Sequence, residues 1–116
     1  MSAYFCLPLS IDVHQAQNMQ NARKKCLEKI PLIREEINNV INQLPICPNN
    51  MLGQMASIQI PKVDPIKFNS KLVDDFKIEI PVFQWADKIL LRVSYQVYNT
   101  EEDINNLIQA LNKLLK

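Results

Sequence analysis

The stretch ILLRVSYQVYNTEEDINNLIQALNKLLK, residues 89–116, decides the fold. Apolar residues recur at every second position over 89–98, and this period of two predicts a strand with one buried face. The face predicted to be buried carries Ile89, Leu91, Val93, Tyr95 and Val97. Asn99 and Thr100 can cap a helix over the remaining residues, whose acidic first turn and basic last turn suit the helix dipole. The stretch is therefore a strand that runs into a capped helix.

Two further strands and a short helix are predicted upstream of this stretch. Residues 77–83 alternate, and the short connection over 85–88 favours an antiparallel hairpin with the strand that follows. Pro81 indicates an edge position, because proline cannot donate to a sheet ladder. Residues 51–60 also alternate and predict a third strand. Asp64 and Pro65 form a plausible N-cap and first-turn proline for a helix that reaches Phe76.

Apolar residues three and four apart predict two helices in the N-terminal part, over residues 5–17 and 19–44. Pro31 predicts a kink or break near Lys29–Ile30, because proline lacks a backbone donor and clashes with the preceding turn. Arg34 is assigned to the polar side of the second helix. The element order α-α-β-α-β-β-α predicts one α+β domain over residues 1–116, with helices on one face of a small, mostly antiparallel three-stranded sheet.

Composition excludes several classes of function. Thirteen basic residues face twelve acidic ones, so the net charge of +1 does not suggest a nucleic-acid surface. The three cysteines lack the paired spacing of a zinc or redox site, which predicts no metal and reduced thiols in the cytoplasm. No apolar run approaches the roughly 20 residues of a membrane span. Gly53 is the only glycine, so no glycine-rich phosphate loop can be formed.

Three segments resemble class V aminotransferase-like enzymes, which are fold-type-I enzymes dependent on pyridoxal phosphate (PLP). Residues 91–104 are similar to the closing motif R-[IV]-S-x-x-x-Y-N-[TS], in which a strand leads into a capped acidic helix. Residues 47–56 and 76–82 are similar to the C-P-x-x-M-x-G-x-[ML]-A and I-E-[VI]-P segments of the isopenicillin-N-epimerase-like branch. The resemblance implies the C-terminal small domain of such an enzyme and covers nearly the whole chain.

The same resemblance implies that chemistry needs a second domain. In this family the lysine that forms the Schiff base with PLP lies on the large domain, which also holds most of the phosphate contacts. We find no counterpart of either in this chain. We therefore expect no catalytic residue and no cofactor bound by this chain alone. The expected partner is the PLP-binding large domain, and the expected substrate of the complete enzyme is an amino or keto acid.

Arg92 is the main candidate site residue. Its planar fork can bind a carboxylate through two parallel hydrogen bonds, and the resemblance implies that it grips the α-carboxylate of the substrate. Ser94 and Gln96 are expected beside it on the polar face of the strand. Tyr98 and Asn99 are further candidates for support of the site, although both fit a structural role at the strand end better.

Two alternatives stay open at this stage. The chain also fits a non-enzymatic α+β interaction or dimerisation module, which would form homo-oligomers through the face that a large domain would cover. It also fits the remnant of an enzyme of this type. The sequence does not choose among transamination, racemisation and desulfuration, and it does not name the substrate.

Overall fold

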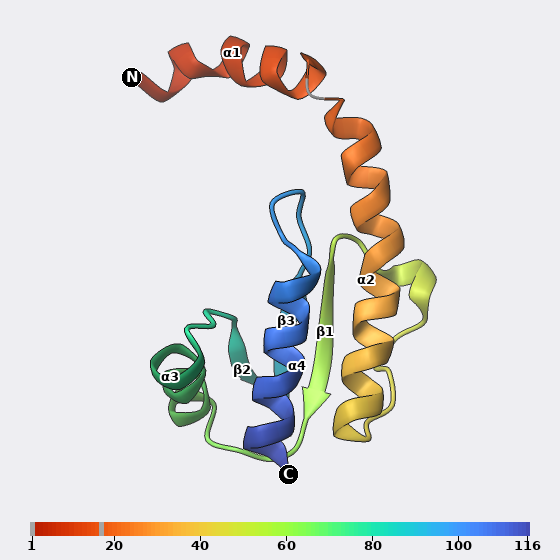
Figure 1. Ribbon diagram of the computed structural model, residues 1–116, viewed down its shortest axis with the longest axis vertical. Coiled ribbons are helices and arrows are strands. Elements are labelled where there is room, and N and C mark those ends of the chain that lie inside the picture. Colours follow the sequence, from red (N-terminus) through yellow and green to blue (C-terminus); the bar gives the residue numbers. More distant parts are fainter. Residues whose placement is uncertain (1, 17) are drawn as a thin grey trace.

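The computed structural model describes residues 2–16 and 18–116, in which four α-helices accompany a three-stranded sheet (Figure 1). The elements, in chain order, are α1 (Ser2–Ala16), α2 (Met19–Ile41), the short 3₁₀ turn η1 (Asn49–Met51), β1 (Met55–Ile60), α3 (Pro65–Phe76), β2 (Val82–Trp85), β3 (Lys88–Ser94) and α4 (Glu101–Leu115). The predicted order of helices and strands is confirmed. The predicted helix over 5–17 corresponds to α1, and its last position, Gln17, lies outside the described residues.

The strand predicted most strongly from the sequence lies at the centre of the sheet. The strand order is β1-β3-β2, and both neighbours are antiparallel to β3. Leu91 pairs with Ile58 of β1 and Val82 of β2, and its side chain is fully buried. The predicted hairpin between β2 and β3 is confirmed, and it turns at Ala86, whose φ of 52° lies in the left-handed region.

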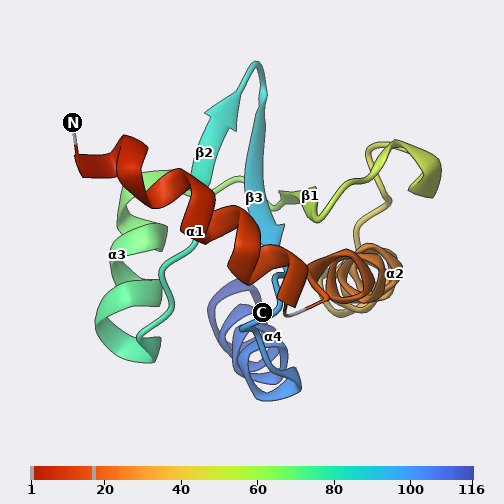
Figure 2. The ribbon, with the colours of Figure 1, turned by 90° about the horizontal axis from the view of Figure 1, so that it is seen from above.

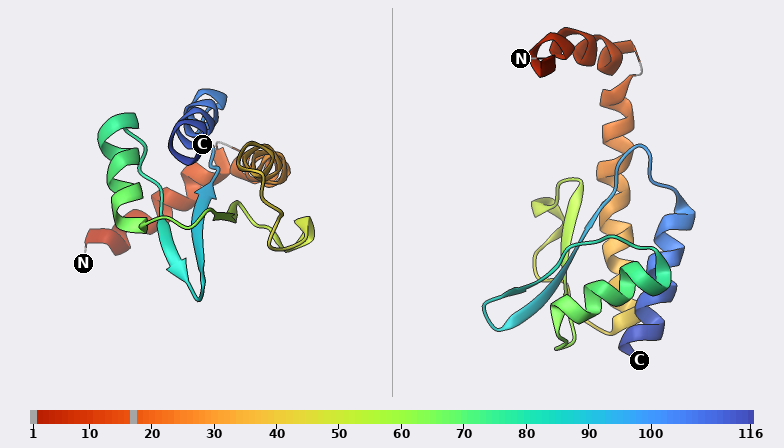
Figure 3. Two further views of the ribbon diagram at one scale, coloured as in Figure 1. Left: turned by 90° about the horizontal axis from the view of Figure 1, so that it is seen from below. Right: turned by 90° about the vertical axis from the view of Figure 1, so that its left-hand side faces the viewer.

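Three helices cover one face of this sheet. α2 contacts β1, α3 contacts β2, and α4 packs against α2 and α3. Figure 3 shows these helices on the same side of the strands. The core between them is made mostly of isoleucine and leucine: Ile30, Ile33, Ile37, Ile58, Leu72, Leu91, Leu107 and Leu111 are among its buried members. The predicted α+β fold with helices on one sheet face is therefore confirmed.

The strand boundaries differ from those predicted. β1 begins only at Met55, because residues 49–51 form a 3₁₀ turn. The strand predicted over 77–83 is instead Val82–Trp85. Lys77 has a left-handed φ of 59° and ends α3 with backbone bonds to the last turn, so the chain is not yet extended there. β3 ends at Ser94 rather than at residue 98, since Ser94 pairs with Met55, the first residue of β1.

Of the kink or break predicted near Lys29–Ile30, the break is wrong, because α2 continues through Pro31 to Ile41. Ile30 and Ile33 on either side of the proline are both buried in the core, and this packing holds the helix together across the missing hydrogen bond. Arg34 is buried rather than solvated. The helix ends before Leu44, because Asn42 adopts a left-handed conformation that caps it.

α1 stands apart from this body. It contacts α2 and runs across the end of the molecule at a steep angle to that helix (Figures 1 and 2). Its apolar residues Phe5, Leu9 and Val13 form the predicted helical stripe, yet all three are exposed. Within the described residues, no helix combines the length and the apolar character that a membrane crossing requires.

Candidate functional site

Arg92 projects from the sheet face that the helices leave uncovered. Its neighbours Leu91 and Val93 are buried on the helix side, so the alternation of β3 places Arg92 and Ser94 on the opposite face, where both are exposed. The backbone N–H of Arg92 donates to the Pro81 carbonyl at 3.0 Å, and Ser57 of β1 lies across from it in register. The guanidinium therefore extends from the central, doubly paired strand of the sheet.

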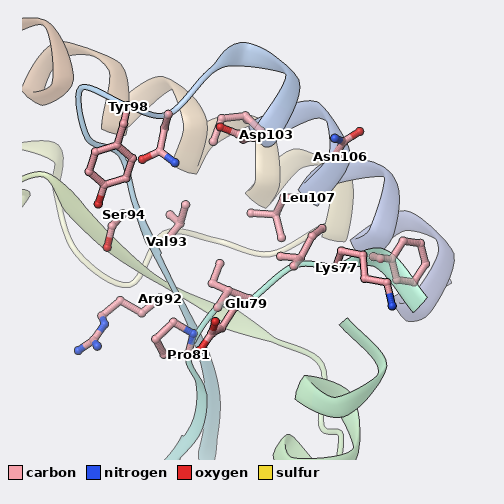
Figure 4. A pocket seen from close by; sticks show the side chains of 15 residues that line it. Lys77, Glu79, Pro81, Arg92, Val93, Ser94, Tyr98, Asp103, Asn106 and Leu107 are labelled. Carbon is pink, nitrogen blue, oxygen red and sulfur yellow. The ribbon is translucent and has the colours of Figure 1, made fainter. Parts of the chain in front are cut away.

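Four of the five predicted site residues line one cleft of about 520 Å³. The cleft lies between the segment 76–81, β3 and the first turns of α4, and its lining includes Arg92, Ser94, Tyr98 and Asn99. Figure 4 shows Tyr98, Ser94 and Arg92 one after another along one side, with the phenol oxygen directed toward Ser94. In the same view the guanidinium points away from α4, toward the mouth of the cleft, and Lys77 lies on the opposite side.

Gln96 does not line this cleft. Its side-chain oxygen accepts a hydrogen bond from Nε2 of Gln54 at 2.9 Å. Its backbone N–H donates to Oδ1 of Asn99 at 2.9 Å, and the N–H of Asn99 donates back to the Gln96 carbonyl at 3.0 Å. Gln96 and Asn99 thus stabilise the turn between β3 and α4. Asn99 has a structural role, but it holds this turn, and Thr100 is the N-cap of α4. Gln96 lies beyond the end of the strand and not beside Arg92.

A capping box positions the start of α4 beside the cleft. The Thr100 hydroxyl accepts from the N–H of Asp103 at 3.2 Å, and the Asp103 carboxylate accepts from the N–H of Thr100 at 2.8 Å. The backbone bond from Thr100 is the main cause that lowers the pKa of Asp103. Although Asp103 belongs to the lining of the cleft, its carboxylate is committed to the helix end.

Arg92 forms no ion pair within the described residues, where the one salt bridge joins Lys29 Nζ to Glu101 Oε1 at 2.7 Å. The hydrogen bond to Glu101 is the main cause that raises the pKa of Lys29. Lys77, the lysine of the cleft, donates from Nζ to the Asp74 carbonyl at 2.7 Å. Of the cationic groups lining the cleft, Arg92 therefore keeps its donors available for an external anion.

A second arginine, Arg34, forms a polar cluster that our reading of the sequence missed. It is 4% exposed, and its guanidinium donates to the Cys47 carbonyl at 2.6 Å and to the side-chain oxygen of Asn49. The Cys47 sulfur lies 3.3 Å from Nη1. The sequence did contain a signal for the burial of Arg34. Arg34 lies four residues after Ile30 and three before Ile37, which places it on the buried side of α2. The cluster anchors the connection that leads from α2 to β1.

The described part of the chain contains no group of three or more side chains that could hold a metal ion. Its cysteines are all free: Cys6 is exposed, Cys26 is buried and Cys47 is half-buried. The cleft beside Arg92 is thus a polar recess that offers one planar cation and the hydroxyls of Ser94 and Tyr98. Such a set is suited to bind and orient a carboxylate.

Comparison with known proteins supports this reading of the fold. The chain is similar to 8-amino-7-oxononanoate synthase from Francisella tularensis, whose crystal structure superposes with a TM-score of 0.67 over 89% of this chain and 30% of that one. The sequence identity is 21%, so this likeness shows the fold alone. No family model matches the chain.

Two curated proteins are similar in sequence. Isopenicillin N epimerase from Amycolatopsis lactamdurans is 29% identical in an alignment of 116 positions, which covers 97% of this chain and 29% of the epimerase. "Probable L-cysteine desulfhydrase, chloroplastic" from Arabidopsis thaliana is 32% identical in an alignment of 85 positions, which covers 60% of this chain and 18% of that protein. The chain thus spans less than a third of either relative. These matches confirm the resemblance inferred from residues 47–56, 76–82 and 91–104: the homologues of this chain are class V aminotransferase-like proteins.

Proposed function

We propose that this chain is the substrate-carboxylate-binding small domain of a PLP-dependent aminotransferase- or epimerase-like enzyme, with residues 1–116 corresponding to its C-terminal part. Arg92 binds the α-carboxylate of an amino or keto acid. The observation that carries the proposal is an exposed guanidinium on the central strand, at the mouth of a cleft, that forms no ion pair among the described residues. The name of one relative specifies L-cysteine, an amino acid with such a carboxylate.

The other residues of the site have distinct roles in this proposal. The fork of Arg92 forms two parallel hydrogen bonds with the carboxylate, which determines its orientation. Ser94 and Tyr98 offer hydroxyl groups on the same side of the cleft. Gln96 and Asn99 support the turn that presents Tyr98, and they do not touch the substrate.

PLP does not fit the cleft of this chain alone. A phosphate cradle needs close approach of the backbone, which glycine permits, and the lining of the described cleft includes no glycine. Lys77 faces the cleft but donates to a backbone carbonyl of its own helix end. We therefore place PLP, its Schiff-base lysine and the proton transfers on a large domain outside this chain, which by itself is not catalytic. We place the protein in the cytoplasm, because three widely spaced cysteines are typical of reduced thiols.

A direct test is a titration of ¹⁵N-labelled chain with pyruvate, monitored by NMR. Because hydrogen bonds to a charged group contribute at most about 3 kcal/mol and exposed ion pairs less, we expect saturable shifts with a dissociation constant of roughly ten millimolar or weaker. The shifts should appear at Arg92 Nε–H and along β3. Methyl pyruvate, which lacks the carboxylate charge, should cause none of them.

Substitutions separate this site from general anion binding. Arg92→Gln should abolish the response to pyruvate, and Arg92→Lys should weaken it, because lysine cannot form the bidentate pair. Arg23→Gln removes an exposed arginine from α2 and serves as the matched control. Pyruvate shifts that persist in Arg92→Gln, or a wild-type chain with no saturable response, would contradict the assignment of Arg92.

The second candidate, a non-enzymatic interaction or dimerisation module, is favoured by the exposed apolar side chains of α1 and by Trp85, which is 61% exposed at the tip of the hairpin. It predicts a concentration-dependent dimer in light scattering and no response to pyruvate. A remnant of an enzyme would differ from both, because it predicts a marginally stable fold in denaturation.

A further inference from the structure

α1 carries two apolar stripes on opposite sides. At 100° per residue, side chains three, four or seven positions apart share a side of the helix. One stripe consists of Tyr4, Leu7 and Ile11. The other, on the opposite side, consists of Phe5, Leu9 and Val13. A helix that packs on a single core needs one such stripe, so α1 is built to be covered from two sides.

All six side chains of these stripes are exposed in this chain, from 41% for Val13 to 83% for Tyr4. Asp12 is the one formally charged residue of α1, which therefore lacks the charged face of a solvated surface helix. Leu107 of α4 shows the contrast, since it is 4% exposed at an equivalent apolar position. Contiguous exposed apolar surface of this kind marks an interaction site.

α1 also contributes nothing to the core of the described residues. The members of that core come from α2, α3, α4, the strands and the segments between them, and the first buried residue of α2 is Cys26. α1 meets α2 at Asn18, which has a left-handed φ of 50° and makes no side-chain capping bond. α1 lies beyond the end of the sheet and runs across it (Figure 1).

We propose that α1 is a docking helix that inserts into an apolar groove of the large domain, and that the small domain itself begins with α2 rather than at residue 1. This inference rests on the proposed function, because the occupant is the large domain of the same enzyme. The match to isopenicillin N epimerase covers 97% of this chain, so it cannot leave out a helix of 15 residues. The chain spans 29% of that protein, and the rest of the epimerase is large enough to enclose α1.

The first part of the test uses the full chain alone. Leu7→Asp and Leu9→Asp place a charge in the middle of either stripe. Ser10→Asp adds the same charge to an exposed position between the stripes and is the matched control. If α1 lies outside the small domain, all three variants keep the wild-type Tm, and hydrogen exchange in α1 is much faster than in α2 and α4. A lower Tm for either leucine variant overturns the inference, because α1 then belongs to the folded unit.

The second part of the test asks whether the large domain is the partner that binds α1. The chain is co-expressed with the portion of the Amycolatopsis lactamdurans epimerase that the match leaves out, and light scattering after gel filtration measures the complex. We expect a one-to-one complex with wild type and Ser10→Asp, and at least a tenfold loss of affinity with Leu7→Asp and with Leu9→Asp. No complex with wild type, or a stripe variant that binds as tightly as Ser10→Asp, overturns the choice of partner.

The proposed role of Arg92 and the proposed docking of α1 can be refuted independently of each other. Arg92→Gln should leave the complex intact if α1 provides the docking contacts, and Leu9→Asp should leave the pyruvate titration of the isolated chain unchanged. A chain that binds pyruvate but not the epimerase portion would refute the docking helix alone. A chain that forms the complex but ignores pyruvate would refute the role of Arg92 alone.

Discussion

Replacement of Arg34 by methionine tests whether the buried guanidinium stabilises the connection between α2 and β1. Arg34 donates to the Cys47 carbonyl and to Asn49, and hydrogen bonds from a charged donor contribute about 1.5–3 kcal/mol each. Methionine also removes the cost of burying the charge, which offsets part of this loss. The Cys47 carbonyl would then remain without its donor, at a cost of about 1–3 kcal/mol. We expect the free energy of unfolding to fall by about 2 kcal/mol.

Urea denaturation followed by far-UV circular dichroism measures this difference by linear extrapolation. Arg23→Met is the matched control, because Arg23 is exposed on the same helix and its replacement should change the stability by no more than about 0.5 kcal/mol. Arg34→Lys keeps a positive charge without the planar fork and should recover little of the loss. If Arg34→Met is as stable as the control, the polar cluster does not hold the connection and our reasoning fails.

Three other predictions concern the stability of α4. Thr100→Ala removes the acceptor for the Asp103 N–H and should cost about 1 kcal/mol in urea denaturation. The pKa of Asp103 is lower in the folded state than in the unfolded state, where it is about 3.9. Its carboxylate therefore stabilises the fold at pH values above about 3.9. This contribution is lost as the pH falls through the folded-state pKa. Asp103→Asn should therefore be less stable than wild type at pH 7 and equal to it in strong acid, and a difference that persists in acid would count against this carboxylate. Leu111→Ala, at a fully buried position, should cost about 2–5 kcal/mol, whereas Leu44→Ala, at a position 85% exposed, should change little; similar losses for both would contradict the assigned core.

Local sequence patterns were sufficient to predict the elements whose partners are near in sequence or whose periodicity or capping residues are clear. The alternation over 91–94 in β3, the proline that follows Asp64 and a helix cap at Thr100 appear in the structure as predicted. Arg92 and Ser94 could be placed on the open face from the alternation alone, because a strand with one buried face directs every second side chain outward. The matches to class V aminotransferase-like proteins agree with the motif in the same stretch.

Distant contacts decided what those patterns could not. Gln96 leaves the face of Arg92 because the chain turns between Gln96 and Asn99, and Gln54, which is remote in sequence, binds the Gln96 side chain. α2 passes through Pro31 because core packing on both sides outweighs a lost hydrogen bond. Arg34 is buried because the segment 47–49 folds back over α2 and supplies acceptors for its donors. Sequence periodicity therefore determined which elements form and which face of each is buried. The tertiary structure decided where the elements end and which polar groups could be buried, because element ends and buried polar groups depend on partners from remote parts of the chain.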